Sequence, residues 1–189
     1  MRSKYETRAL VLARTHVGEA NTFVTLLTPD LGLVQAQAQS LRKSGAKLAY
    51  SLTTLAESDV VLVRGKDGWR LAGAVLEENW FQKLQRPETR AAAARVSGLF
   101  LRLVAGEAQD VQLFILARAF ISSLAELPAD MHELAEILVV LRLLATLGLD
   151  SGDIPGDIQD FTPSVLSAVL DDRKTYIARI NTGISASGL

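Results

Sequence analysis

Apolar and polar residues alternate over much of the first 80 positions, which is typical of β-strands that bury one face. Between positions 33 and 39, Leu33, Gln35 and Gln37 alternate with small apolar residues, so we expect one solvated and one buried face. The same pattern, together with the density of Thr, Val, Phe and Leu, predicts five strands at 5–14, 22–28, 33–39, 52–64 and 69–76.

Residues that favour turns separate these strands. Pro29 presets φ and Gly32 can adopt a positive φ, so a turn is expected between the second and third strands. Asp67 and Gly68 predict a tight hairpin between the fourth and fifth strands, and residues 40–50 are expected to form a loop. Five short strands joined mostly by short turns predict a small barrel or sandwich, of which an OB-type barrel is one solution.

The period changes to that of amphipathic helices from residue 87 onwards. Pro87 suits the first turn of a helix and Gly106 suits a helix end. Helices are expected at 87–106, 110–127, 130–147, 162–170 and 172–181. Apolar helices joined by short loops should pack on one another. The chain is therefore expected to be an α+β protein, with an OB-like barrel over residues 1–78 and a helical domain over residues 79–189.

The composition argues against several classes of chemistry. The chain has no cysteine and two histidines, so thiolate metal sites and disulfides are excluded and no metal site is expected. No nucleophile with a neighbouring base is evident, so we expect neither an enzyme nor a bound cofactor. No apolar stretch approaches the roughly 20 residues of a membrane span, and no signal-peptide core follows the first residues. A cytoplasmic protein that does not enter a membrane is expected.

Charge is distributed unevenly along the chain. Residues 1–86 carry 12 Lys and Arg against 8 Asp and Glu, a net charge of +4, whereas residues 87–189 carry 8 against 13, a net charge of −5. The basic half is where a polyanion would bind. An imbalance of this size also arises by chance on two solvated surfaces, so charge alone does not decide between the two interpretations.

Five short motifs occur in a particular order over the first 85 residues. They are Thr7-Arg8-Ala9-Leu10-Val11-Leu12, Gly18-Glu19-Ala20-Asn21, Thr28-Pro29-Asp30-Leu31-Gly32-Leu33-Val34, Gln37-Ala38-Gln39-Ser40-Leu41-Arg42-Lys43 and Lys47-Leu48-Ala49-Tyr50-Ser51-Leu52. In this order and at this spacing they resemble the RecO family of bacterial recombination mediators. The helical half resembles the family more loosely, through an apolar bundle that ends in Leu147-Gly148-Leu149.

This resemblance implies a nucleoid-associated protein of DNA repair that binds single- and double-stranded DNA without strong sequence preference. It also implies a RecR-type mediator and single-strand-binding protein as partners, the loading of recombinase and the annealing of complementary strands. Two departures from the family pattern matter. Many members carry a four-cysteine zinc cluster after the position of Leu149, which this chain lacks, and Ser40 stands where a glycine is common.

Basic residues of the barrel half are the candidates for contacts with DNA phosphates, because flexible cations can follow a phosphate backbone. Three of them share one loop, and the others are expected to extend its track along the barrel. An ordinary solvated loop is the alternative for the three. The predicted nucleic-acid-binding residues are Arg14, Arg42, Lys43, Lys47, Tyr50, Arg64, Lys66 and Arg70.

Aromatic residues add a second possible contact, since single strands are often held by bases that stack on aromatic rings. Tyr50 adjoins the basic loop, so stacking and a structural role are equally open for it, whereas Phe23 is expected in the core. In the helical half, Phe120 and Ile121 belong either to the bundle core or to a groove for a partner peptide. A protein-interaction adaptor without nucleic-acid contact remains the alternative function.

Overall fold

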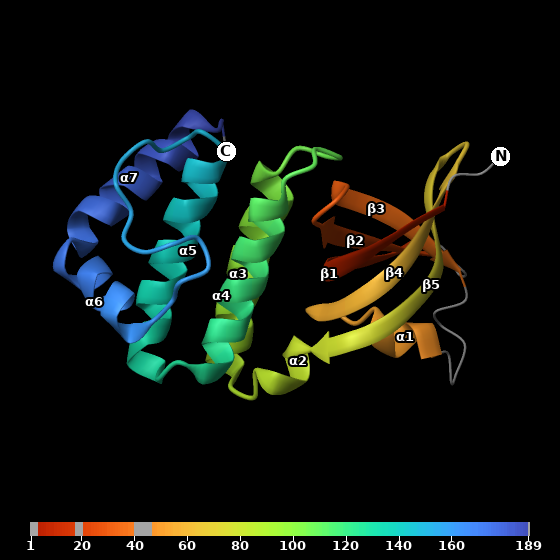
Figure 1. The fold of residues 1–189 in the computed structure, drawn as a ribbon, viewed down its shortest axis with the longest axis horizontal. Helices are drawn as coiled ribbons and strands as arrows, with labels where there is room; N and C mark the ends of the chain where they lie inside the picture. Colours follow the sequence, from red (N-terminus) through yellow and green to blue (C-terminus); the bar gives the residue numbers. More distant parts are fainter. Residues whose placement is uncertain (1–3, 18–20, 40–46, 189) are drawn as a thin grey trace. The chain divides into compact units, whose positions relative to one another are not determined.

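The computed structural model describes residues 4–17, 21–39 and 47–188, which form two compact units (Figure 1). We call them the barrel unit, Met1–Lys83 with Ala105–Phe114, and the helical unit, Leu84–Val104 with Ile115–Leu189. The segment Ala105–Phe114 therefore groups with the strands, although it lies far from them in the sequence.

The described strands of the barrel unit close into a barrel in the order β1-β2-β3-β5-β4. Neighbouring strands are antiparallel except β3 and β5, which run parallel and pair through Ala36 with Trp69 and Gln37 with Arg70. The expected OB-like barrel is confirmed. The strands are β1 (Lys4–Val17), β2 (Asn21–Thr28), β3 (Gly32–Gln39), β4 (Ala56–Gly65) and β5 (Gly68–Asn79).

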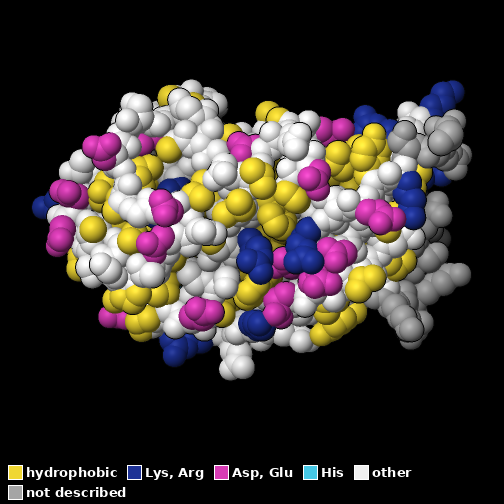
Figure 2. Space-filling model, viewed as in Figure 1, with side chains coloured by type: hydrophobic (Ala, Val, Ile, Leu, Met, Phe, Trp, Pro, Cys, Tyr) yellow, Lys and Arg dark blue, Asp and Glu magenta, His cyan; other side chains and the backbone are white. Residues whose placement is uncertain are grey.

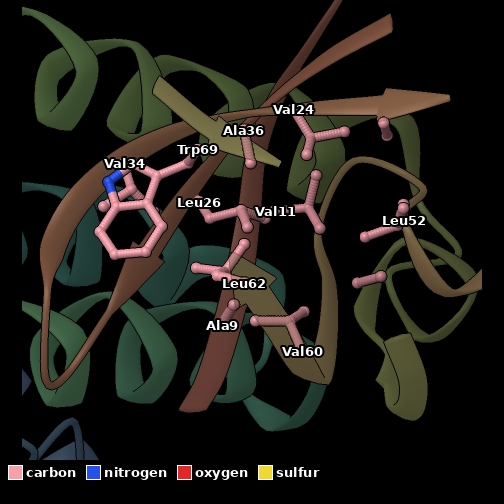
Figure 3. Close-up of a cluster of buried hydrophobic side chains, with 12 residues drawn as sticks. Ala9, Val11, Val24, Leu26, Val34, Ala36, Leu52, Val60, Leu62 and Trp69 are labelled. Carbon is pink, nitrogen blue, oxygen red and sulfur yellow. The ribbon is translucent and has the colours of Figure 1, made fainter. Parts of the chain in front are cut away.

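The inward faces of the strands form the barrel core (Figure 3). In β2, Val24 and Leu26 are fully buried, whereas Phe23 beside them is only half-buried, because neighbouring residues of a strand point to opposite faces. The expected core position of Phe23 is therefore wrong. Leu52 lies at one end of the buried cluster in Figure 3 and Trp69 at the other.

The segment before β4 differs from the expectation of a loop followed directly by a strand. Lys47–Ser51 forms helix α1, and β4 begins only at Ala56. Leu48 packs against the core cluster and Leu52 is fully buried in it. These two side chains lie one helical turn apart, so their burial favours a helix over an extended chain. Leu55 then adopts a φ of 65°, and its backbone N donates to a carbonyl of β1 at 2.8 Å, which directs the chain into β4.

Gly32 begins β3 at a place where two constraints coincide. Its φ is +69°, and the Thr28 hydroxyl stabilises the turn by donating to the Gly32 carbonyl at 3.1 Å. A Cβ at this position would lie 2.2 Å from the carbonyl oxygen of Ala108. The Leu33 backbone N donates to the Gly106 carbonyl at 3.1 Å. The segment that carries Gly106 and Ala108 can therefore approach β3 only because residue 32 has no side chain.

The described chain after β5 consists of helices joined by loops, and the predicted long helices are confirmed. Helix α5 packs against α3, α6 and α7, and its Leu138 and Leu141 are fully buried. Phe120 and Ile121 of α4 are buried as well, so they belong to the core rather than to a groove. No described helix is long and apolar enough to cross a membrane. The helices are α2 (Trp80–Lys83), α3 (Pro87–Leu103), α4 (Val111–Glu126), the 3-10 turn η1 (Ala129–Met131), α5 (His132–Thr146), α6 (Pro163–Asp171) and α7 (Arg173–Ala186).

Arg142 of α5 organises the loop between α5 and α6. Its side chain is 4% exposed and donates to the carbonyls of Pro155 at 2.8 Å, Ile158 at 3.2 Å and Asp160 at 2.9 Å. The guanidinium also lies 5.0 Å from the centre of the Phe161 ring. Burial lowers the pKa of Arg142 to about 10, so the group remains charged at neutral pH. One side chain thus satisfies three carbonyls that the loop does not pair itself.

We predict that Gly32→Ala lowers the free energy of unfolding by about 2–4 kcal/mol, because it adds both backbone strain and a clash with the Ala108 carbonyl. Urea titration followed by circular dichroism measures this change. Gly98→Ala is the matched control, since Gly98 lies inside α3 with open space around its Cβ position, and it should raise the stability by about 0.5–1 kcal/mol. A loss below about 0.5 kcal/mol for Gly32→Ala would contradict the close approach.

We further predict that Arg142→Met lowers the free energy of unfolding by about 3 kcal/mol, because it leaves three loop carbonyls without their donor. The exposed Arg102→Met in α3 serves as the control and should change the stability by less than about 0.5 kcal/mol. Equal stabilities of the two variants in urea titrations would show that the loop does not depend on Arg142.

Candidate nucleic-acid interface

A pocket of about 320 Å³ opens on the barrel unit beside the parallel pair β3 and β5. Strands β2 and β3, the β4–β5 hairpin and the segment Ala105–Phe114 contribute its walls. Its volume falls in the range of pockets that hold small ligands. We call it the Trp69 pocket; it is lined by Phe23, Gln35, Gln37, Arg64, Asp67, Gly68, Trp69, Arg70 and Glu107.

Trp69 and Arg64 form the structural centre of this pocket. The Trp69 ring is 6% exposed and meets the Tyr5 ring edge-on, with 5.1 Å between centroids and an interplanar angle of 81°. The Arg64 guanidinium lies over the same indole, 4.8 Å from its centroid, a geometry that a cation–π interaction stabilises. Tyr5 therefore fixes the orientation of the ring, and Arg64 covers it.

Glu107 holds Arg64 in this position. Nη1 of Arg64 donates to both carboxylate oxygens of Glu107, at 2.7 and 2.9 Å. Both side chains remain about half exposed, 48% for Arg64 and 46% for Glu107. The guanidinium is thus oriented by a charged partner while part of its surface still faces solvent.

The charges that line the Trp69 pocket balance one another. Arg64 and Arg70 face Asp67 and Glu107, which gives a formal net charge of zero. The Gln35 and Gln37 side chains of β3 line the same pocket and are exposed and half-buried, respectively. Amide groups both donate and accept hydrogen bonds, so the pocket offers polar recognition without a strong net field.

The structure brings together only some of the predicted binding residues. Arg64 and Arg70 line the same pocket, and Lys66 is exposed in the turn between their strands. Arg14 is half-buried on β1 opposite Val24 and does not line the pocket.

The predicted basic loop falls mostly outside the described residues. Arg42 and Lys43 fall outside the described residues, and the backbone of Lys47 begins α1. Tyr50 of α1 is 49% exposed, and its hydroxyl donates to Oε1 of Gln82 at 3.1 Å, so its ring edge is tethered to α2.

Two ion pairs of the barrel unit have no local signal in the sequence. Glu107 is 43 residues from Arg64, and only the fold pairs them. Arg8, which does not line the pocket, donates to Asp59 at 3.0 Å and lies 3.5 Å from Glu57 and 3.6 Å from Glu77. The hydrogen bond to Asp59, with the neighbouring carboxylates, raises the pKa of Arg8, and this acidic surrounding makes it a poor phosphate ligand.

The helical unit carries a small negative charge, with 9 Lys and Arg against 11 Asp and Glu, a formal net charge of −2. On the face in view in Figure 2, acidic side chains stand among neutral and apolar ones, with few basic side chains between them. Three of its arginines are tied to acidic partners, through Arg95 with Glu136, Arg173 with Glu133 and Arg179 with Asp150. A pocket of this unit is lined by one arginine, Arg118, together with Phe161.

Known proteins resemble this chain over the barrel and part of the helices. The family model described as "Recombination protein O N terminal" matches residues 1–76. A protein named DNA repair protein RecO from one strain of Dehalococcoides mccartyi is 33% identical over 145 residues, which cover 76% of this chain and 56% of that protein. The DNA repair protein RecO from another strain of this species is 47% identical over 62 residues, which cover 33% of this chain and 24% of that protein.

A cyanobacterial relative extends the match slightly further. The DNA repair protein RecO of Synechococcus elongatus is 31% identical over 153 residues, which cover 80% of this chain and 48% of that protein. The chain thus matches about half the length of these relatives. The family model covers the barrel strands except the end of β5, and it covers every residue that lines the Trp69 pocket except Glu107. On these grounds, residues 1–76 belong to the N-terminal domain of the RecO family, and the chain as a whole is similar to proteins of that family.

Proposed function

We propose that this protein is a DNA-binding recombination mediator of DNA repair, and that its barrel binds single- and double-stranded DNA without strong sequence preference. The observation that carries the proposal is the family match over residues 1–76, the part of the chain that also forms most of the Trp69 pocket. The relatives are named for DNA repair, and an OB-like barrel is a common scaffold for oligonucleotide binding.

Electrostatics would supply most of the affinity. The first 86 residues carry a net charge of +4, and Lys66 and Arg70 are exposed at or beside the pocket. Cations that neutralise phosphates release condensed counterions, so affinity falls steeply with salt. Contacts of this kind follow the backbone and do not distinguish sequences.

The proposed partners follow from the family. They are a RecR-type mediator and single-strand-binding protein, with which the protein would load recombinase and anneal complementary strands. The helical unit is the candidate partner surface, because its acidic character disfavours contact with DNA. The role proposed is that of a non-catalytic adaptor.

A protein-interaction adaptor that does not touch nucleic acid is the second candidate. Charge compensation in the barrel unit favours it, since Glu107 neutralises Arg64 and three carboxylates surround Arg8. Fluorescence anisotropy of labelled single-stranded DNA over a salt series, with and without a RecR-type partner, separates the two functions. Salt-dependent binding of the chain alone favours the mediator, and absence of binding at low salt favours the adaptor.

We predict that Arg42→Ala combined with Lys43→Ala weakens binding to all DNA sequences alike and reduces the salt slope for a single strand by about 1.4, because two phosphate contacts are lost. Anisotropy titrations against oligo-dT measure both quantities. The control with the same change in net charge is Arg102→Ala combined with Lys174→Ala, two exposed positions of the helical unit. An unchanged affinity and slope in the first variant would remove the basic loop from the interface.

A further inference from the structure

We propose that the Trp69 pocket binds one nucleobase of a single strand, stacked on the Arg64 guanidinium that covers Trp69. The proposal rests on the DNA-binding function proposed above, and it assigns to this pocket a ligand different from the phosphates that the basic loop would contact. The base would lie on the solvent-facing side of the guanidinium, in line with the indole beneath it.

The geometry of Arg64 supports a stacking platform rather than a phosphate clamp. Its Nη1 is already occupied by both carboxylate oxygens of Glu107, and the charge of the guanidinium is compensated there. Its Cζ lies over the Trp69 ring, 4.8 Å from the ring centroid, and 48% of the side chain is exposed. Guanidinium planes of this kind are among the surfaces on which unstacked bases lie in nucleic-acid complexes.

The walls of the pocket also suit an uncharged planar ligand. The lining charges sum to zero, so a phosphate gains little from entering. Gln35 and Gln37 offer amide donors and acceptors from β3, which match the hydrogen-bonding edge of a base. Phe23, which is half-buried on the outer face of β2, adds an apolar contact. A pocket with these groups favours a base over its backbone.

Substitution of Glu107 distinguishes a stacking role of Arg64 from a phosphate-binding role. If Arg64 contacts phosphate, removal of the Glu107 charge frees a cation and tightens the binding of DNA. If Arg64 is a platform, removal of this anchor lets the guanidinium leave the indole and weakens the binding of bases. The two functions of Arg64 therefore predict opposite effects of Glu107→Gln.

The test compares oligo-dT with an abasic oligomer of the same length, which keeps the phosphates and lacks the bases. Anisotropy titrations of the full chain give the ratio of the two affinities. We expect the unmodified protein to bind oligo-dT about tenfold more tightly, since one stacked base contributes this order of affinity. Arg64→Lys, which keeps the charge and removes the plane, should abolish the ratio while leaving the affinity for the abasic oligomer unchanged.

Two further variants complete the design. Arg102→Lys is the matched control, because it makes the same substitution at an exposed position of α3 that does not line the pocket, so this variant should keep the ratio. Glu107→Gln should lower the affinity for oligo-dT several-fold without lowering that for the abasic oligomer. The abasic affinity of each variant also reports whether its barrel remains folded.

Each outcome bears on one of the two proposals. Four results overturn the nucleobase pocket and leave DNA binding intact. They are a ratio near one in the unmodified protein, a ratio that survives Arg64→Lys, a ratio lost equally in Arg102→Lys, and tighter oligo-dT binding by Glu107→Gln. Failure of the unmodified chain to bind either oligomer at low salt overturns the DNA-binding function, and the pocket proposal with it.

Discussion

Parallel pairing of β3 with β5 is the contact on which the proposed interface depends. It closes the barrel and sets Gln37 beside Arg70 and Ala36 beside Trp69. Since side chains alternate along each strand, this register leaves Gln35 and Gln37 on the outer face of β3 and Trp69 in the core. The pocket is thus a consequence of barrel closure, and a slip of one residue would replace its polar wall with apolar side chains.

Most of the arginines discussed above are bound to carboxylates or backbone carbonyls of the same chain. A count of charged residues along the sequence includes arginines that are paired with carboxylates in the structure. Arg64 is paired with Glu107, and Arg8 is paired with Asp59. In the helical unit, Arg142 binds three loop carbonyls and Arg179 binds Asp150. These two arginines hold the segment between α5 and α6 by hydrogen bonds. Such arginines orient and support neighbouring groups, and they contribute less to long-range attraction than their number suggests.

The sequence predicted what depends on local patterns and missed what depends on contacts distant in the chain. Alternation around Ala36 identified β3 with its buried face, and helical spacing identified the long helices, because both signals repeat over many residues. Helix α1 has only five residues and shows no period, so the sequence predicts a loop there. Glu107 reaches Arg64 across 43 residues, and nothing near Glu107 indicates that partner. The sequence favours a core position for Phe23 because large aromatic residues usually lie there, and only the strand register shows that it faces outward.

Backbone amide exchange with and without a saturating oligo-dT tests the central claim, that the barrel rather than the helical unit is the DNA-binding surface. If oligo-dT binds the barrel, we expect slower exchange in β3, in the β4–β5 hairpin around Lys66, and in the segment that carries Glu107. Exchange in α5, α6 and α7 should change little. Slower exchange confined to the helical unit, with the barrel unchanged, would contradict this claim.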